Sequence, residues 1–174
     1  MKLTWFGGTT VRVHIGGVIL VVDPDGAPAA VDRAELLSGT DRVIKAGELR
    51  SVDFSNWRPR KVGRLLDETE EPSVEAWSNE TGAILVEALG EAPLLLMPHS
   101  VPPLGRWVEG AIVVLFGGGG QLVDLGRALL DERSPRLLAL AGNETAIDDA
   151  VPRLRDHLDG SGLVALEAGM ALEV

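Results

Sequence analysis

The sequence predicts an α+β fold in a single domain that spans residues 1–174. Residues 2–24 carry three strand patterns joined by glycine turns, and residues 110–159 alternate apolar strands with predicted helices. Such alternation with short loops predicts parallel strands that are covered by helices. A chain of 174 residues, 45% of them apolar, is long enough to bury one substantial core.

The first predicted strands form a meander. Residues 2–6 are one strand, and residues 10–15 alternate strictly, with apolar side chains on one face and polar ones on the other. Gly16 and Gly17 suit a hairpin turn because both can adopt positive φ without a Cβ clash. Residues 18–24 are apolar almost throughout, which predicts a strand buried on both faces.

The rest of the chain continues the alternation, except for residues 47–79, which are polar and carry no clear pattern. The predicted elements are a helix or turn (29–36), a hairpin-like pair of strands (82–89 and 92–98), a strand (110–116), a helix (121–133), a strand (136–142), a helix (144–159) and a last strand or hairpin (163–174).

Charge and composition exclude several functions. The net charge of -10 works against binding to nucleic acid or to an anionic membrane. The one basic cluster, "NWRPRK" at residues 56–61, fits either an anion clamp or a solvated loop, and an acidic stretch follows it. No cysteine is present, so disulfides and thiolate chemistry are excluded. No apolar run reaches bilayer length, and the start lacks signal-peptide features, so we expect a cytoplasmic protein.

Residues 1–24, "MKLTWFGGTTVRVHIGGVILVVDP", are similar to the opening of metallo-β-lactamase-fold proteins, especially the small metal-dependent hydrolase-like branch. That opening runs strand, Gly-His, strand, glycine turn, strand, Asp-Pro. The later segments "LLLMPHS", "GAIVVLFGGGG", "RLLALAGN" and "LEAGMALEV" fall in the order that the family gives its second half. The resemblance implies an αββα sandwich over nearly the whole chain.

The chain departs from this family at its metal ligands. The family's His-x-His-x-Asp-His motif follows a strand and gathers side chains around one or two metal ions. Here the resemblance equates it with residues 38–41, where Asp41 alone could bind metal. Residues 7–8 are Gly-Gly in place of Gly-His, residues 98–100 are Pro-His-Ser in place of Gly-Asp-Thr, and residues 141–143 replace a late histidine. The resemblance therefore implies a domain that has lost its metal centre.

Three histidines remain in the chain. His14 lies on the polar face of a strand and His157 on a charged helix, so both are expected at the surface. His99 follows a buried strand, where α/β folds collect functional groups. Together with Asp23 and Asp41 it is the candidate for an unusual catalytic site, although a catalytic zinc ion usually takes three protein ligands. In the resemblance Asp23 has a structural role beside the site.

A glycine-rich loop offers a second candidate site. Gly118, Gly119 and Gly120 separate a strand from a helix, an arrangement that can present backbone N–H groups to an anion. The spacing matches neither a P-loop nor Gly-x-Gly-x-x-Gly. The alternative is a tight loop that permits close packing.

Four tryptophans supply the last sequence observation. Trp5 and Trp107 adjoin strands and are expected in the core. Trp57 and Trp77 flank the unassigned middle segment, where an exposed flap would make them a subunit contact.

These observations favour a non-catalytic binding, regulatory or assembly protein without a metal cofactor. The expected partner is a small molecule or another protein, with a homo-oligomer as one form, and neither nucleic acid nor membrane. The alternative is a metal-dependent hydrolase, with zinc the metal to test, at a site near His99, Asp23 and Asp41. Three or more converging histidine and carboxylate groups would favour the enzyme.

Overall fold

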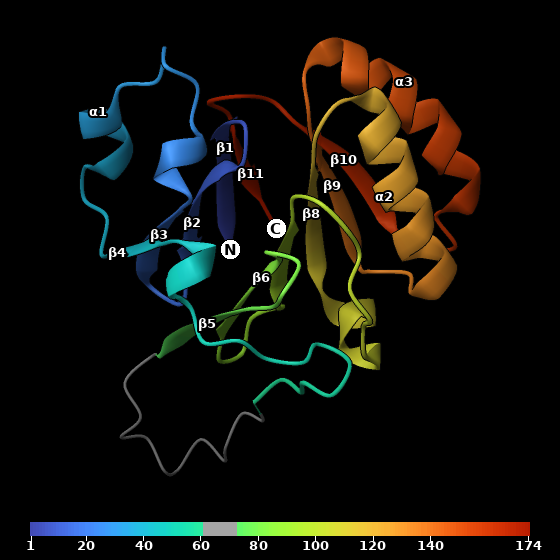
Figure 1. Ribbon diagram of the computed structural model, residues 1–174, viewed down its shortest axis with the longest axis horizontal. Helices are drawn as coiled ribbons and strands as arrows, with labels where there is room; N and C mark the ends of the chain where they lie inside the picture. The colour runs from blue at the N-terminus through green and yellow to red at the C-terminus, as the bar shows by residue number, and fades with distance from the viewer. Residues whose placement is uncertain (61–72) are drawn as a thin grey trace.

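The structure is a computed structural model that describes residues 1–60 and 73–174, and it places two β-sheets face to face (Figure 1). The first sheet has five strands in the order β11-β1-β2-β3-β4. Its strands are β1 (Lys2–Gly7), β2 (Thr10–Ile15), β3 (Val18–Val22), β4 (Arg42–Ile44) and β11 (Ala171–Glu173). Strands β11, β1, β2 and β3 pair antiparallel, and β4 pairs parallel with β3.

The second sheet has six strands in the order β10-β9-β8-β7-β6-β5. Its strands are β5 (Val74–Ser78), β6 (Ile84–Ala88), β7 (Leu94–Met97), β8 (Ile112–Phe116), β9 (Leu137–Ala141) and β10 (Gly162–Leu166). The run from β7 to β10 is parallel, and β6 and β5 complete the sheet antiparallel. The predicted α+β class and the helix-linked parallel strands are therefore confirmed.

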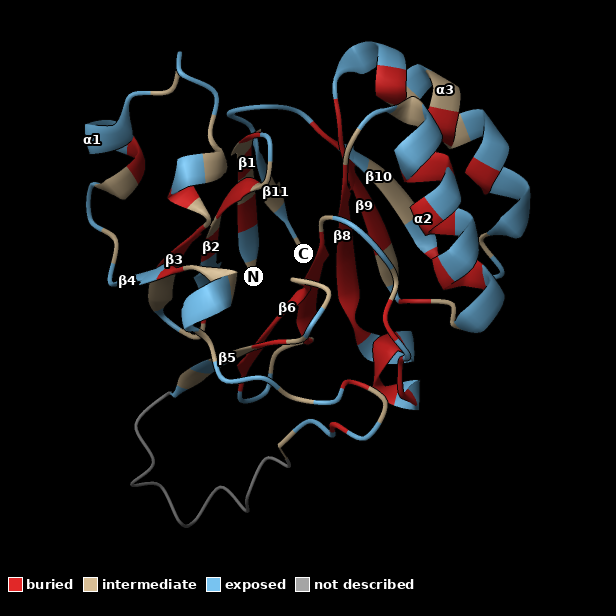
Figure 2. Ribbon diagram, viewed as in Figure 1, coloured by how far each residue is buried: buried red, intermediate tan, exposed pale blue. Residues whose placement is uncertain are grey.

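The core between the sheets follows the period-two pattern of the strands. Val11, Val13 and Ile15 of β2 face inward and are buried, as the alternation predicts. Val114 and Phe116 of β8 meet them from the second sheet. Figure 2 shows the buried strands of both sheets facing each other across this core.

Helices cover the outer faces of the sheets. The helices α2 (Gly119–Glu132) and α3 (Glu144–Leu154) pack on the six-stranded sheet (Figure 1). They approach closely at Gly126, where a Cβ atom would lie 2.7 Å from the Leu154 methyl groups. The short helix α1 (Arg33–Leu37) lies against the five-stranded sheet, and Arg12 of β2 donates hydrogen bonds to the carbonyl oxygens of Leu36 and Ser38.

Four single-turn 3₁₀ helices complete the described elements: Pro24–Gly26, Ala46–Glu48, Arg106–Gly110 and Arg155–His157. No helix among residues 1–60 and 73–174 has the length and apolarity needed to cross a bilayer.

The end of the chain connects the two sheets. Strand β10 extends the six-stranded sheet parallel to β9, whereas β11 pairs antiparallel with β1 in the five-stranded sheet. Residues 163–174 therefore do not form the hairpin that was one of the two expectations. They contain most of β10 and all of β11, which are single strands in different sheets. The chain crosses between the sheets at residues 167–170, where the N–H of Gly169 donates to the carbonyl oxygen of Trp5.

The tryptophans of the middle segment are packed together. Trp57 is 8% exposed, and its ring centroid lies 4.8 Å from that of Trp107 and 5.8 Å from that of Trp77. Trp57 is therefore not an exposed subunit contact, because its ring lies in the core beneath the six-stranded sheet. The turn before it is fixed by Asp53, whose pKa is lowered by hydrogen bonds from the hydroxyl and backbone N–H of Ser55.

Within the basic cluster at residues 56–61, Arg60 is the described residue that pairs with carboxylates. Arg60 pairs through Nε with the buried carboxylate of Glu87 at 2.8 Å, and the backbone N–H of Arg60 donates to the same carboxylate. The guanidinium of Arg58 donates to the carbonyl oxygen of Trp57. Lys61 and the acidic residues up to position 72 lie outside the described residues. Arg60 therefore forms an ion pair with the buried Glu87, so its guanidinium is not free to bind an external anion.

Candidate functional site

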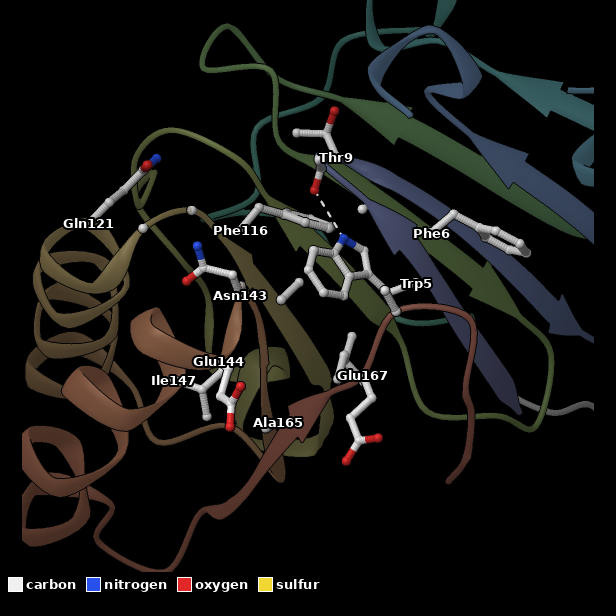
Figure 3. Close-up of a pocket in the computed structure, with 18 of the residues that line it drawn as sticks. Trp5, Phe6, Thr9, Phe116, Gln121, Asn143, Glu144, Ile147, Ala165 and Glu167 are labelled. Atoms are coloured by element: carbon white, nitrogen blue, oxygen red, sulfur yellow. Dashed lines mark hydrogen bonds between the residues drawn. The ribbon is translucent and has the colours of Figure 1, made fainter. Parts of the chain in front are cut away.

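A cavity of about 1170 Å³ opens where the two sheets meet at the carboxyl ends of their strands (Figure 3). Its walls come from the ends of β1, β8, β9 and β10 and from the first residues of α2 and α3. Parallel strands that alternate with helices bring their carboxyl ends to one edge, which is where ligands bind in such sheets. The volume slightly exceeds the range of about 300–1,000 Å³ that is typical of small-molecule sites.

Glycines shape the loops at this edge. The N–H of Gly117, after β8, donates to the carbonyl oxygen of Ala141 at the end of β9. A Cβ atom at Gly142 would lie 2.8 Å from the carbonyl oxygen of Gly117, so the two loops touch backbone to backbone. Gly117 itself has a φ of 143°, which a larger residue adopts rarely. The loops therefore converge because neither carries a side chain at the contact.

The floor of the cavity is aromatic. Trp5 and Phe116 are buried to 8% and 3% exposure and come from β1 and β8. Figure 3 shows the two rings close together, with Glu167 beyond the indole. The indole N–H of Trp5 donates to the carbonyl oxygen of Gly8 at 3.0 Å, which fixes both the ring and the β1–β2 turn.

The rim of the cavity is acidic. Exposed carboxylates of Glu144, Asp148 and Glu167 line it, and neither lysine nor arginine occurs among its lining residues in the described chain. Several negatively charged carboxylates at the mouth of an apolar cleft produce a strong negative potential there. The site therefore suits a positively charged or neutral ligand better than an anion.

The loop between β3 and α1 closes one side of the cavity through Pro28. Asp25 anchors this loop by pairing with Lys45 at 2.6 Å and with Arg33 at 2.7 Å. The hydrogen bonds from Lys45 and Arg33 lower the pKa of Asp25, and the same pairing raises the pKa of Lys45. The wall is thus held by exposed ion pairs outside the cavity.

The predicted glycine triplet has three different environments. Gly118 precedes α2 and lines the cavity. Gly119 begins the helix and packs against α3, since a Cβ there would lie 2.9 Å from a carboxylate oxygen of Asp149. Gly120 is exposed, and a Cβ atom there would point into open space. Close packing explains Gly119, and Gly118 alone of the three contributes to the site.

His99, Asp23 and Asp41 do not come together. His99 is exposed on the cavity wall after β7. Asp23 follows β3, and its carboxylate accepts a hydrogen bond from Thr9 while its backbone carbonyl accepts one from Thr10 at 2.6 Å. Asp41 lies at the opposite end of β3, where its carboxylate accepts the N–H of Ile19 at 2.7 Å. Four residues of strand separate Ile19 from Asp23, or roughly 13 Å at about 3.3 Å per residue.

Asp23 joins β3 to the β1–β2 turn through its hydrogen bonds with Thr9 and Thr10. Its own backbone is left-handed, with a φ of 47°. Within residues 1–60 and 73–174, no three histidine, aspartate or glutamate side chains lie close enough to hold a metal ion. His14 and His157 are exposed, as expected.

Several lining residues escaped the sequence analysis. Glu144 and Glu167 read as ordinary surface acids, and Phe116 reads as the end of a buried strand. A signal was present for Glu144, because it directly follows Asn143, whose side chain caps α3 by accepting the N–H of Ala146 at 2.9 Å. Loops at the carboxyl ends of consecutive parallel strands share one edge, so their first residues were candidates.

Comparisons with models of known protein families, with curated proteins and with solved structures found no match to this chain.

Proposed function

We propose that this chain is a non-catalytic binding protein on a metallo-β-lactamase-like αββα scaffold, and that its ligand occupies the cavity at the carboxyl ends of the strands. The observation that carries the proposal is the cavity itself, of about 1170 Å³, with an aromatic floor and an acidic rim. This combination favours a small organic cation with an apolar body.

The positions equated with the family's ligands support the scaffold. Gly7 and Gly8, Pro98 and His99, and residues 141–143 come from three distant parts of the chain, and all line the one cavity. Residues 38–41 do not, because they precede β4, whereas the family's motif follows a strand. The loop that follows β4 begins at Lys45 and likewise carries no histidine.

The ligand class is tested with three probes that share a benzene ring and differ in charge: benzylamine, benzyl alcohol and benzoate. We expect benzylamine to bind best and benzoate not to bind, by isothermal titration and by thermal shift. Replacing both Glu144 and Glu167 with glutamine should weaken benzylamine binding roughly threefold to tenfold, since an exposed charge pair contributes up to about 1 kcal/mol.

Glu173→Gln is the matched control, because Glu173 is an exposed acid outside the cavity. It should leave benzylamine binding unchanged. Binding of benzoate as strong as that of benzylamine would contradict the charge assignment. Failure of all three probes at millimolar concentration would contradict the proposed function.

The absence of a metal centre is tested separately. Protein purified without chelator and then offered zinc, manganese and iron should hold far less than one metal ion per chain by elemental analysis, because no three histidine, aspartate or glutamate side chains of the described residues could hold a metal ion together. His99→Ala serves as the control and should give the same metal content. A stoichiometric metal that disappears in His99→Ala would instead support the rival hydrolase.

A further inference from the structure

Strand β10 forms an open edge of the six-stranded sheet. It pairs with β9 over five residues, from Gly162 opposite Leu137 to Leu166 opposite Ala141. It stands last in the strand order, so no strand of the described chain pairs with its other side. Such an edge presents a row of backbone N–H and C=O groups to another chain.

The other edges of the two sheets carry the charges that natural proteins use to prevent pairing, and β10 does not. Strand β5 contains Glu75, β4 contains Arg42 and β11 contains Glu173. The sequence of β10, "GLVAL", contains neither charge nor proline. Among the described edge strands, β10 is thus the one without protection against a partner strand.

Apolar side chains surround this edge. Leu163 and Val164 of β10 are half-buried, as are Ile147 and Val151 on the helix α3.

We propose that two copies of this chain associate through β10, which pairs antiparallel with itself across a two-fold axis. With the axis at Val164, Leu163 lies opposite Ala165 of the second copy, and Gly162 lies opposite Leu166. Because the same patch is used twice, the contact is closed and self-complementary. The two six-stranded sheets then form one continuous sheet, with both pairs of helices on the same face.

The charges of α3 favour a second copy in this orientation. The helix connects the parallel strands β9 and β10 and packs on the six-stranded sheet, so it runs opposite to both strands. Its first residue, Glu144, is an exposed acid, and Arg155 at its end is an exposed base. A two-fold axis reverses the second helix, so each Glu144 approaches Arg155 of the other copy. The proposal uses no ligand, and it shares Glu144 with the rim of the proposed binding site.

Sedimentation equilibrium tests the association. The chain has a mass of 18.4 kDa, and we expect twice that mass at micromolar concentration. Ala165→Lys adds a charge at an exposed edge position and should weaken the dimer at least about tenfold, which corresponds to about 1.4 kcal/mol. Ala165→Thr and Val43→Lys, the latter on the β4 edge, should leave the dimer intact.

A charge exchange tests the orientation of α3. Glu144→Arg and Arg155→Glu should each weaken the dimer, and the double variant should restore it, because opposite charges then face each other again. Equal circular dichroism spectra and melting temperatures would show that the variants fold. If Ala165→Lys fails to fold, the charge exchange decides the question alone. A wild-type monomer, or a dimer that neither Ala165→Lys nor the single charge variants weaken, would overturn the proposal.

Discussion

Trp57→Ala is expected to lower the free energy of unfolding by about 3–5 kcal/mol, the usual cost of truncating a buried tryptophan. The ring is 8% exposed and contacts two other indoles edge-on, at centroid distances of 4.8 Å to Trp107 and 5.8 Å to Trp77. Each aromatic contact contributes about 0.5–1.5 kcal/mol beyond its buried area. Alanine would remove both contacts and leave a cavity under β5 and β6.

The neighbouring residues cannot easily fill that cavity. The indole N–H of Trp107 donates to the carbonyl oxygen of Phe54 at 2.7 Å in a buried position, and Phe54 packs edge-on against the same indole. Moving Trp107 toward the vacancy would break this hydrogen bond. The protein therefore retains most of the void, and the loss includes the cavity as well as the transferred side chain.

Urea unfolding followed by far-UV circular dichroism measures the effect. Trp57→Phe is the matched control, because it keeps an aromatic ring and should lose clearly less stability than alanine. A loss below about 1 kcal/mol for Trp57→Ala would contradict core packing of this ring. Sedimentation of the alanine variant should match the wild type, since the structure places Trp57 inside the subunit.

The sequence predicted the strands well because their signals are local. Strict alternation over residues 10–15 fixes which face of β2 is buried, and Gly16 and Gly17 have the positive φ values of 55° and 77° that a tight turn requires. The same holds for the helices, whose glycine and asparagine starts adjoin apolar strands. These features need no knowledge of the rest of the chain.

Strand pairing and side-chain burial that depend on contacts between distant parts of the chain could not be predicted from local sequence patterns. Whether β10 and β11 pair with each other or with separate sheets depends on β9 and β1, which lie far apart in the sequence. The burial of Trp57 likewise depends on Trp107, fifty residues away. For this reason the sequence left open whether residues 163–174 form a strand or a hairpin, and whether Trp57 is buried or makes a subunit contact.

The candidate site was predicted in part for the same reason. Of the residues predicted for a site, His99 and Gly118 line the cavity, whereas Asp23, Gly119 and Gly120 do not. Asp41 was included on an assumed alignment, but it directly precedes β4 and lies at the end of β3 opposite the cavity. The acidic rim was missed because Glu144 and Glu167 look like ordinary solvated carboxylates in the sequence. Only the folded structure shows that both line one cavity.

Gly8→Ala is the second large effect that we expect, a loss of about 2–5 kcal/mol in the free energy of unfolding. Gly8 has a φ of 54°, in the left-handed region, where a residue with a Cβ atom costs about 1–2 kcal/mol. The Cβ would also lie 2.1 Å from the carbonyl oxygen of Gly26. This neighbour is backbone, and relieving such an overlap costs about 1–3 kcal/mol more.

Gly26 cannot retreat freely, because its N–H donates to the carbonyl oxygen of Asp23 at 3.0 Å, and Asp23 is itself bonded to Thr9 and Thr10. Gly17→Ala is the matched control. Its φ of 77° is also left-handed, but no atom lies within 4 Å of the added Cβ, so only the backbone cost of about 1–2 kcal/mol applies. Urea unfolding of the two variants isolates the overlap as the difference between them.

The result bears on the proposal that this scaffold lacks the family's metal centre. Gly8 lies where the resemblance equates the chain with a family histidine, and a histidine there would carry the same Cβ atom into Gly26. If Gly8→Ala costs no more than Gly17→Ala, the turn can yield, and the loss of the histidine has no steric basis. If it costs clearly more, the β1–β2 turn and the Pro24–Gly26 turn have packed into space that a histidine would need. Restoring one ligand would then require rebuilding both turns.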